Sequence, residues 1–149
     1  ARGFSAEDFA RSHPGGALGR KLLVHVSDIM HSGAELPFVP QGATLSDALL
    51  EMTKKGLGMT AVVDRHRKLV GVFTDGDLRR TLEKPVDIKH INILDVMGKQ
   101  PKTIRPHRLA AEAAQLMEQY KILNMLVTDD DGQLIGAFTM HDLLRAGVV

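Results

Sequence analysis

The sequence predicts a mixed α+β (α/β) fold made of two copies of one β-α-β-β-α unit. The first observation is an internal repeat, because a shift of 65 positions aligns residues 44–80 of the 149-residue chain with 109–145. The match is densest where LVGVFT at 69–74 meets LIGAFT at 134–139. The second observation is the pattern of apolar residues, which is the same in both copies. Apolar residues first recur at helical spacing, and two short apolar runs follow, separated by five polar or turn-forming residues.

The first copy, residues 23–84, is predicted to begin its structure with a short extended piece near Phe38. A helix follows, because apolar residues recur at helical spacing between 45 and 52. Candidates for the cap and the end of this helix are Thr44 or Ser46 and Gly56 or Gly58. The β-branched run at 60–63, the polar segment 64–68 and the apolar run at 69–73 then predict a β-hairpin. Thr74 opens a second helix that contains Leu78 and Leu82.

The second copy, residues 91–149, follows a connector at 85–90 and repeats the same order. The expected elements are an extended piece at 103–104, a helix at 108–120, strands at 124–128 and 134–138, and a helix at 139–146. Neither copy has enough apolar residues to cover both faces of its own sheet. We therefore expect the two copies to pack back to back around a shared core.

Composition excludes several classes of function. Hydrophobic residues make up 44% of the chain and charged residues 25%, as in globular proteins. The formal net charge of +1 and the five Phe, one Tyr and no Trp argue against a nucleic-acid surface. No apolar run reaches the roughly 20 residues of a membrane span, and no secretory leader pattern is present. The absence of cysteine is consistent with a cytoplasmic location. No zinc-hydrolase, EF-hand or Walker A motif occurs, so we expect no metal site.

The endings GVFT-x-x-D and GAFT-x-x-D, with the openings Asp28-Ile29-Met30 and Asp95-Val96-Met97, resemble the cystathionine β-synthase (CBS) domain. The resemblance covers residues 23–149. It implies a tandem pair related by a pseudo-twofold axis, known as a Bateman module. It also implies a homo-oligomer formed through the helices, because CBS pairs commonly dimerise.

The T-x-x-D motifs at Thr74–Asp77 and Thr139–Asp142 have two interpretations. In one, each is a helix cap, since Thr at the N-cap with an acidic residue three positions later is close to a capping box. In the other, each is part of a nucleotide site. The CBS resemblance implies this second role, with Thr74 and Thr139 at the phosphate and Asp77 and Asp142 at the ribose hydroxyls. The two roles are compatible.

Other residues are weaker candidates for the same site. By resemblance, Thr103 matches a position that faces the base or ribose, whereas the first copy has Pro37 and Phe38 there. The strand openings Met59-Thr60 and Asn124-Met125 are candidates for base contacts through backbone groups, or are simply core residues. Cationic side chains beside the motifs either neutralise phosphates or form an exposed helix face. These are Arg79, Arg80, His141 and Arg145.

The head segment, residues 1–22, belongs to neither copy. It resembles the end of the sugar isomerase (SIS) domain in D-arabinose-5-phosphate isomerases, where a CBS pair follows the catalytic domain. His13, in S-H-P-G-G, matches a histidine of that family's active site. The resemblance implies a parent enzyme that interconverts ribulose 5-phosphate and arabinose 5-phosphate for Kdo and lipopolysaccharide synthesis, with its own SIS domain as partner. We expect this chain by itself to have no catalytic residues and no isomerase activity, and residues 23–149 to contain no sugar-phosphate active site.

The predicted function is therefore nucleotide sensing in the cleft between the repeats, with no required cofactor. The candidate ligands are CMP-Kdo, the activated end product of the route, and the adenine nucleotides AMP and ATP. The alternative is an assembly module without a ligand, in which both T-x-x-D motifs act only as helix caps.

Overall fold

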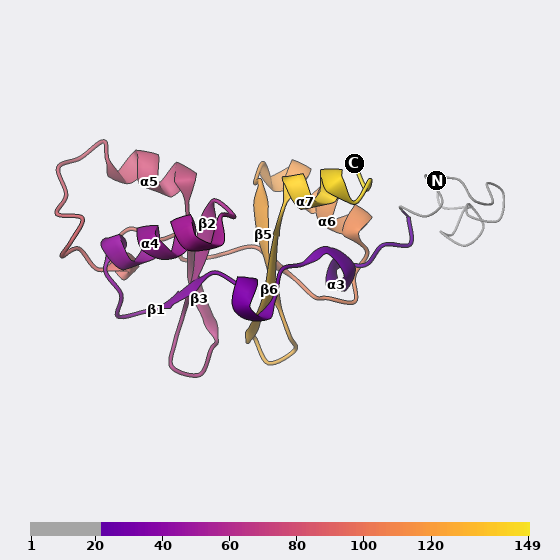
Figure 1. The fold of residues 1–149 in the computed structure, drawn as a ribbon, viewed down its shortest axis with the longest axis horizontal. Helices are drawn as coiled ribbons and strands as arrows, with labels where there is room; N and C mark the ends of the chain where they lie inside the picture. Colours follow the sequence, from indigo (N-terminus) through magenta and orange to yellow (C-terminus); the bar gives the residue numbers. More distant parts are fainter. Residues whose placement is uncertain (1–21) are drawn as a thin grey trace.

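The computed structural model describes residues 22–149 and confirms the predicted class and the order of elements (Figure 1). The first copy contains β1 (Phe38–Pro40), α4 (Leu45–Lys55), β2 (Met59–Val63), β3 (Leu69–Thr74) and α5 (Asp75–Thr81). The second copy contains β4 (Thr103–Ile104), α6 (Ala110–Tyr120), β5 (Asn124–Thr128), β6 (Leu134–Thr139) and α7 (Met140–Arg145). Each copy forms a three-stranded sheet in which the first strand is parallel and the third antiparallel to the middle strand.

The ends of the long helices follow local chemistry. Thr44 caps α4 by accepting from the Asp47 amide, and Gly56 ends the helix in a left-handed conformation with φ of 72°. In the second copy Lys121 adopts the same conformation, with φ of 58°. Helix α6 begins two residues later than predicted. Leu109 stays extended because it pairs with His25, and the Ala110 amide donates to the Val24 carbonyl.

The two copies share a core, as the sequence predicts. The middle strands β2 and β5 are buried along almost their whole length, so side chains on both of their faces are covered. One face of each sheet packs against the helices of its own copy. The other faces meet in a central cluster of Leu36, Met59, Ala61, Val63, Leu126, Leu134 and Ala137. Figure 1 shows the two sheets side by side between the two sets of helices.

Each copy receives its opening segment from the other. The short helix α3 (Val26–Ile29), which precedes the first sheet in sequence, packs into the core of the second copy. The 3-10 turn η2 (Ile93–Asp95) packs into the core of the first copy. The packing units therefore differ from the sequence repeats 23–84 and 91–149, because each unit contains the opening segment of the other repeat.

The hairpin turns also join the two copies. The Leu69 amide donates to the Gly132 carbonyl at 3.2 Å, and the Leu134 amide donates to the Arg67 carbonyl at 3.0 Å. Within the first copy, the Arg67 guanidinium lies 4.1 Å from the centre of the Phe38 ring, in cation–π contact.

Among residues 22–149, no helix is both long and apolar enough to cross a bilayer.

Candidate functional site

A cleft of about 740 Å³ lies between the two copies, at the ends of β3 and β6 where α5 and α7 begin. Both repeats contribute to its walls, and several wall residues are repeat partners, such as Thr74 with Thr139 and Arg80 with Arg145. The lining residues are His31, Gly56, Leu57, Gly58, Thr74, Asp75, Gly76, Arg79, Arg80, Lys121, Ile122, Leu123, Asn124, Thr139, Met140, His141, Asp142 and Arg145.

The first T-x-x-D motif forms a complete capping box on α5. The Asp77 amide donates to the Thr74 hydroxyl at 3.2 Å, and Asp77 Oδ2 accepts from the Thr74 amide at 3.0 Å. The hydroxyl of Thr74 also donates to Asp77 Oδ2, at 3.1 Å. The remaining oxygen, Oδ1, accepts from Arg80 Nη2 at 2.6 Å. Asp77 itself lies in a smaller adjoining hollow of about 320 Å³, and Arg80 lines both the hollow and the cleft.

The second motif repeats the capping box on α7 but differs at the outer oxygen. Asp142 Oδ2 accepts from the Thr139 amide at 2.8 Å and from its hydroxyl at 3.2 Å. Asp142 Oδ1 accepts from Nε2 of His31, at 2.9 Å, and this histidine comes from the segment that crosses over from the first copy. The opposite ring nitrogen of His31 lies 2.9 Å from Glu35 Oε1. The helix-cap interpretation is therefore correct for both motifs, and it leaves a binding role open.

The imidazole of His31 lies between two carboxylates. Burial lowers the pKa of His31, but the hydrogen bonds to Glu35 and Asp142 outweigh it and hold the pKa above the ordinary value of 6.5. When protonated, the ring donates a charge-assisted hydrogen bond to each carboxylate.

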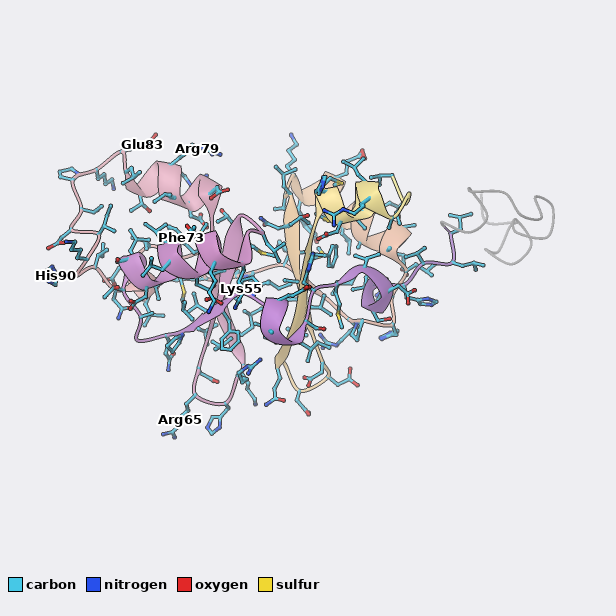
Figure 2. The ribbon with its side chains drawn as sticks, viewed as in Figure 1. Lys55, Arg65, Phe73, Arg79, Glu83 and His90 are labelled. Carbon is cyan, nitrogen blue, oxygen red and sulfur yellow. The ribbon has the colours of Figure 1, made fainter. Side chains whose placement is uncertain are left out.

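The charge of the cleft favours an anion. Four of its lining residues are Lys or Arg, and two are Asp. Arg79, Lys121 and Arg145 form no ion pair with any other residue of the described part of the chain. Figure 2 shows Arg79 on α5, near the top of the view. Within residues 22–149, no group of three His, Asp or Glu side chains is arranged to hold a metal ion.

The structure separates the remaining sequence candidates. Asn124, Arg79 and His141 line the cleft. Thr103 is exposed on β4 and does not line it. Met59, Thr60 and Met125 are buried within their strands and do not line the cleft, as the core interpretation predicts. His13 and the rest of the head segment lie outside the described residues.

Among the titratable side chains of the cleft, sequence reasoning missed His31 and Lys121. His31 follows the Asp28-Ile29-Met30 opening of the first copy, and nothing in the sequence shows that this segment crosses to the second sheet. The sequence does contain one sign that His31 is unusual. The shift of 67 positions that aligns the two openings pairs His31 with Gly98, so the two copies differ at this position. Lys121 stands at the position of Gly56 in the first copy and has the same left-handed backbone.

The comparisons with known proteins identify the family. The model of the CBS domain matches residues 26–84 and 93–149, and the chain belongs to the CBS domain family as a tandem pair. Over its whole length the chain is 58% identical to arabinose 5-phosphate isomerase KdsD of Pseudomonas aeruginosa and 56% identical to that of Escherichia coli. It covers 46% and 45% of those two proteins, so the chain spans less than half the length of these relatives.

Solved structures agree with the fold. The structure of CBSX2 in complex with AMP is 28% identical, with a TM-score of 0.71, and the match covers 84% of this chain and 96% of that one. A CBS domain protein from Pyrobaculum aerophilum complexed with AMP is 20% identical, with a TM-score of 0.73. That match covers 80% of this chain and 90% of the other, and it supports the fold alone.

Proposed function

We propose that this chain is the ligand-sensing CBS pair of an arabinose 5-phosphate isomerase, and that a nucleotide or nucleotide sugar binds in the cleft between the repeats. The isomerase assignment is supported by the 56–58% identity to KdsD proteins along the whole chain. Catalysis, in this proposal, belongs to a SIS domain in the same protein, to which His13 of the head segment belongs.

The observation that carries the binding proposal is the cleft itself. Its volume is within the range of small-molecule sites, and its four Lys and Arg side chains suit a phosphate-bearing ligand. Thr74 and Thr139, from the two repeats, also line this cationic surface. An ionised carboxylate such as that of Asp77 or Asp142 only accepts hydrogen bonds, which suits the adjacent hydroxyls of a ribose.

Two ligand classes fit this description. The AMP complex of CBSX2, a similar CBS pair, supports an adenine nucleotide. CMP-Kdo is supported by the logic of feedback, because an enzyme that supplies an early precursor gains control by sensing the activated end product. Either ligand can regulate the isomerase only if it binds two states of the enzyme with different affinity.

The proposal is tested by calorimetric titration of the chain with AMP, ATP, CMP and CMP-Kdo. We expect binding of at least one of them, with the affinity of Arg145→Gln reduced about tenfold or more because a phosphate contact is lost. Arg65→Gln is the matched control, since Arg65 is exposed on the hairpin turn far from the cleft (Figure 2). No heat from any of the four ligands would contradict the proposal. Feedback by CMP-Kdo would be rejected if a saturating concentration left the rate of the full-length enzyme unchanged.

A second candidate function is assembly of the isomerase oligomer. It is favoured by large apolar side chains that are exposed on helices of both copies, such as Leu50 on α4 and Leu144 on α7. The test is to measure the molar mass of the wild-type chain and of Leu50→Glu by light scattering. If Leu50 lies in a dimer interface, the added charge is expected to convert the dimer to a monomer. Sensing and assembly are compatible, and the titration above reports on sensing alone.

A further inference from the structure

The two halves of the cleft are built alike in their backbone. At the first half, the Gly98 amide donates to the Val72 carbonyl at 2.8 Å, and the Val72 amide donates back at 3.0 Å. At the second half, His31 and Ala137 exchange the same pair of bonds, again at 2.8 and 3.0 Å. Val72 and Ala137 are repeat partners, so His31 and Gly98 occupy equivalent positions beside the two motifs.

The side chains at these equivalent positions make the two carboxylates different. At Asp142 both oxygens are engaged, one by Thr139 and the other by the imidazole of His31. The Asp142 side chain is only 8% exposed, and its histidine partner is 24% exposed and is itself fixed by Glu35. A ribose can reach this carboxylate only by displacing a part-buried, charge-assisted hydrogen bond.

Asp77 has no such obstruction, because Gly98 has no side chain. Its outer oxygen is paired with Arg80, whose side chain is 69% exposed. An exposed pair of this kind is weak, since water solvates both partners. Arg80 lines both the cleft and the adjoining hollow that contains Asp77, so this exposed side chain lies at the boundary between the two.

We infer that His31 is a specificity-determining residue, which closes the Asp142 half of the cleft to a ribose and restricts the chain to one nucleotide, bound through Asp77. This inference rests on the proposed function, because it assumes that the cleft binds a nucleotide. It further assigns different roles to two motifs that are identical at their Thr and Asp positions.

Calorimetric titration with AMP and with CMP as probes gives the number of sites. For the wild-type chain we expect one nucleotide per chain. Asp77→Asn is expected to weaken this binding at least tenfold, whereas Asp142→Asn is expected to change it less than threefold. His31→Gly, which copies the first half of the cleft, is expected to raise the number of sites to two. Circular dichroism melting checks that each variant is folded.

The reciprocal variant Gly98→His tests the same inference without changing the His31 region. Its result therefore does not depend on whether that region tolerates a substitution. A Cβ atom at this position makes only ordinary contacts, because its nearest neighbour is the Val72 carbonyl oxygen at 3.4 Å. We expect the new imidazole to engage Asp77 and to weaken nucleotide binding at least tenfold. Nucleotide binding equal to that of the wild type in a folded Gly98→His would contradict the inference.

The outcomes separate the two claims. Two sites in the wild-type chain, or loss of binding in Asp142→Asn but not in Asp77→Asn, would overturn the role of His31 and leave the proposed function intact. Absence of binding to the wild-type chain and to every variant would overturn the proposed function, and this inference with it.

Discussion

Asp77 and Asp142 show how one motif acquires two environments. Both carboxylates cap their own helix through the same threonine bonds. Their outer oxygens differ, since one accepts from a largely exposed arginine and the other from a partly buried histidine. Because the net value of a hydrogen bond depends on how far its partners are removed from water, the two carboxylates are expected to differ in their contribution to stability.

Asp142→Asn keeps one acceptor oxygen for the cap but loses the charged partner of His31, and it is expected to destabilise the fold by about 1–3 kcal/mol. Asp77→Asn likewise keeps one acceptor oxygen for the cap and loses only an exposed ion pair, worth about 0–1 kcal/mol. Urea denaturation at pH 6 measures both variants against the wild type. Equal destabilisation by the two substitutions would show that the His31–Asp142 contact adds nothing to stability.

The contribution of His31 to stability is expected to depend on pH. Folding raises the pKa of His31 above 6.5, so the native state binds this proton more tightly than the unfolded chain does. The stabilisation is therefore complete below about pH 6.5 and is lost as the pH rises through the raised pKa. We expect the difference in free energy of unfolding between wild type and His31→Gln to shrink between pH 6 and pH 9. A difference that stays constant or grows would contradict this sign.

The opening segments of the two copies are held against the opposite sheets by close contacts at glycine. A Cβ atom at Gly71 would collide with the side chain of Met97 and would lie 2.8 Å from the carbonyl oxygen of Gly98. At Gly136 all the nearest atoms belong to the side chain of Met30. The glycines of LVGVFT and LIGAFT therefore provide the space in which each exchanged segment docks.

Gly71→Ala is expected to destabilise the protein by about 1–3 kcal/mol, because a backbone carbonyl must move as well as a side chain. Gly136→Ala is expected to cost less, since the flexible Met30 side chain can shift. Thermal unfolding followed by circular dichroism gives both values. The order of the two effects is the test, and a larger loss at Gly136 would show that the Gly98 carbonyl is free to move.

The molecule as a whole is expected to fold as one unit, because its halves exchange segments and share a core. Val26, from the first copy, is fully buried in the core of the second. Ile93, from the second copy, is fully buried in the core of the first. The central cluster further joins the faces of both sheets. Neither half can bury its apolar surface without the other.

Fragments 22–84 and 85–149 are therefore expected to be unfolded when separate and to fold when mixed at equal concentration. The break falls at an exposed position between α5 and η2. Proton–nitrogen correlation NMR shows the outcome, since a folded complex disperses amide signals that cluster in an unfolded chain. A dispersed spectrum from either fragment alone would show that the exchanged segments are dispensable.

The sequence by itself determined the elements and their order, because periodicity, caps and turns are local properties. Thr44, Thr74 and Thr139 lie at helix N-caps as their spacing predicts. The hairpins β2–β3 and β5–β6, each with a five-residue connection, follow from the same kind of pattern. The CBS family and the T-x-x-D motifs could be recognised from the sequence, because the motifs recur at a fixed shift of 65 positions.

Only the tertiary structure decided which segments meet. Nothing local in the sequence indicates that the segment ending at His31 crosses to the second sheet, because that depends on the packing of Met30 at Gly136 and on the bonds to Ala137. The crossing brings His31 to Asp142 and places Gly98 at the corresponding position near the first motif. Two motifs that are the same in sequence at their Thr and Asp therefore become unequal in space, because their neighbours come from distant parts of the chain.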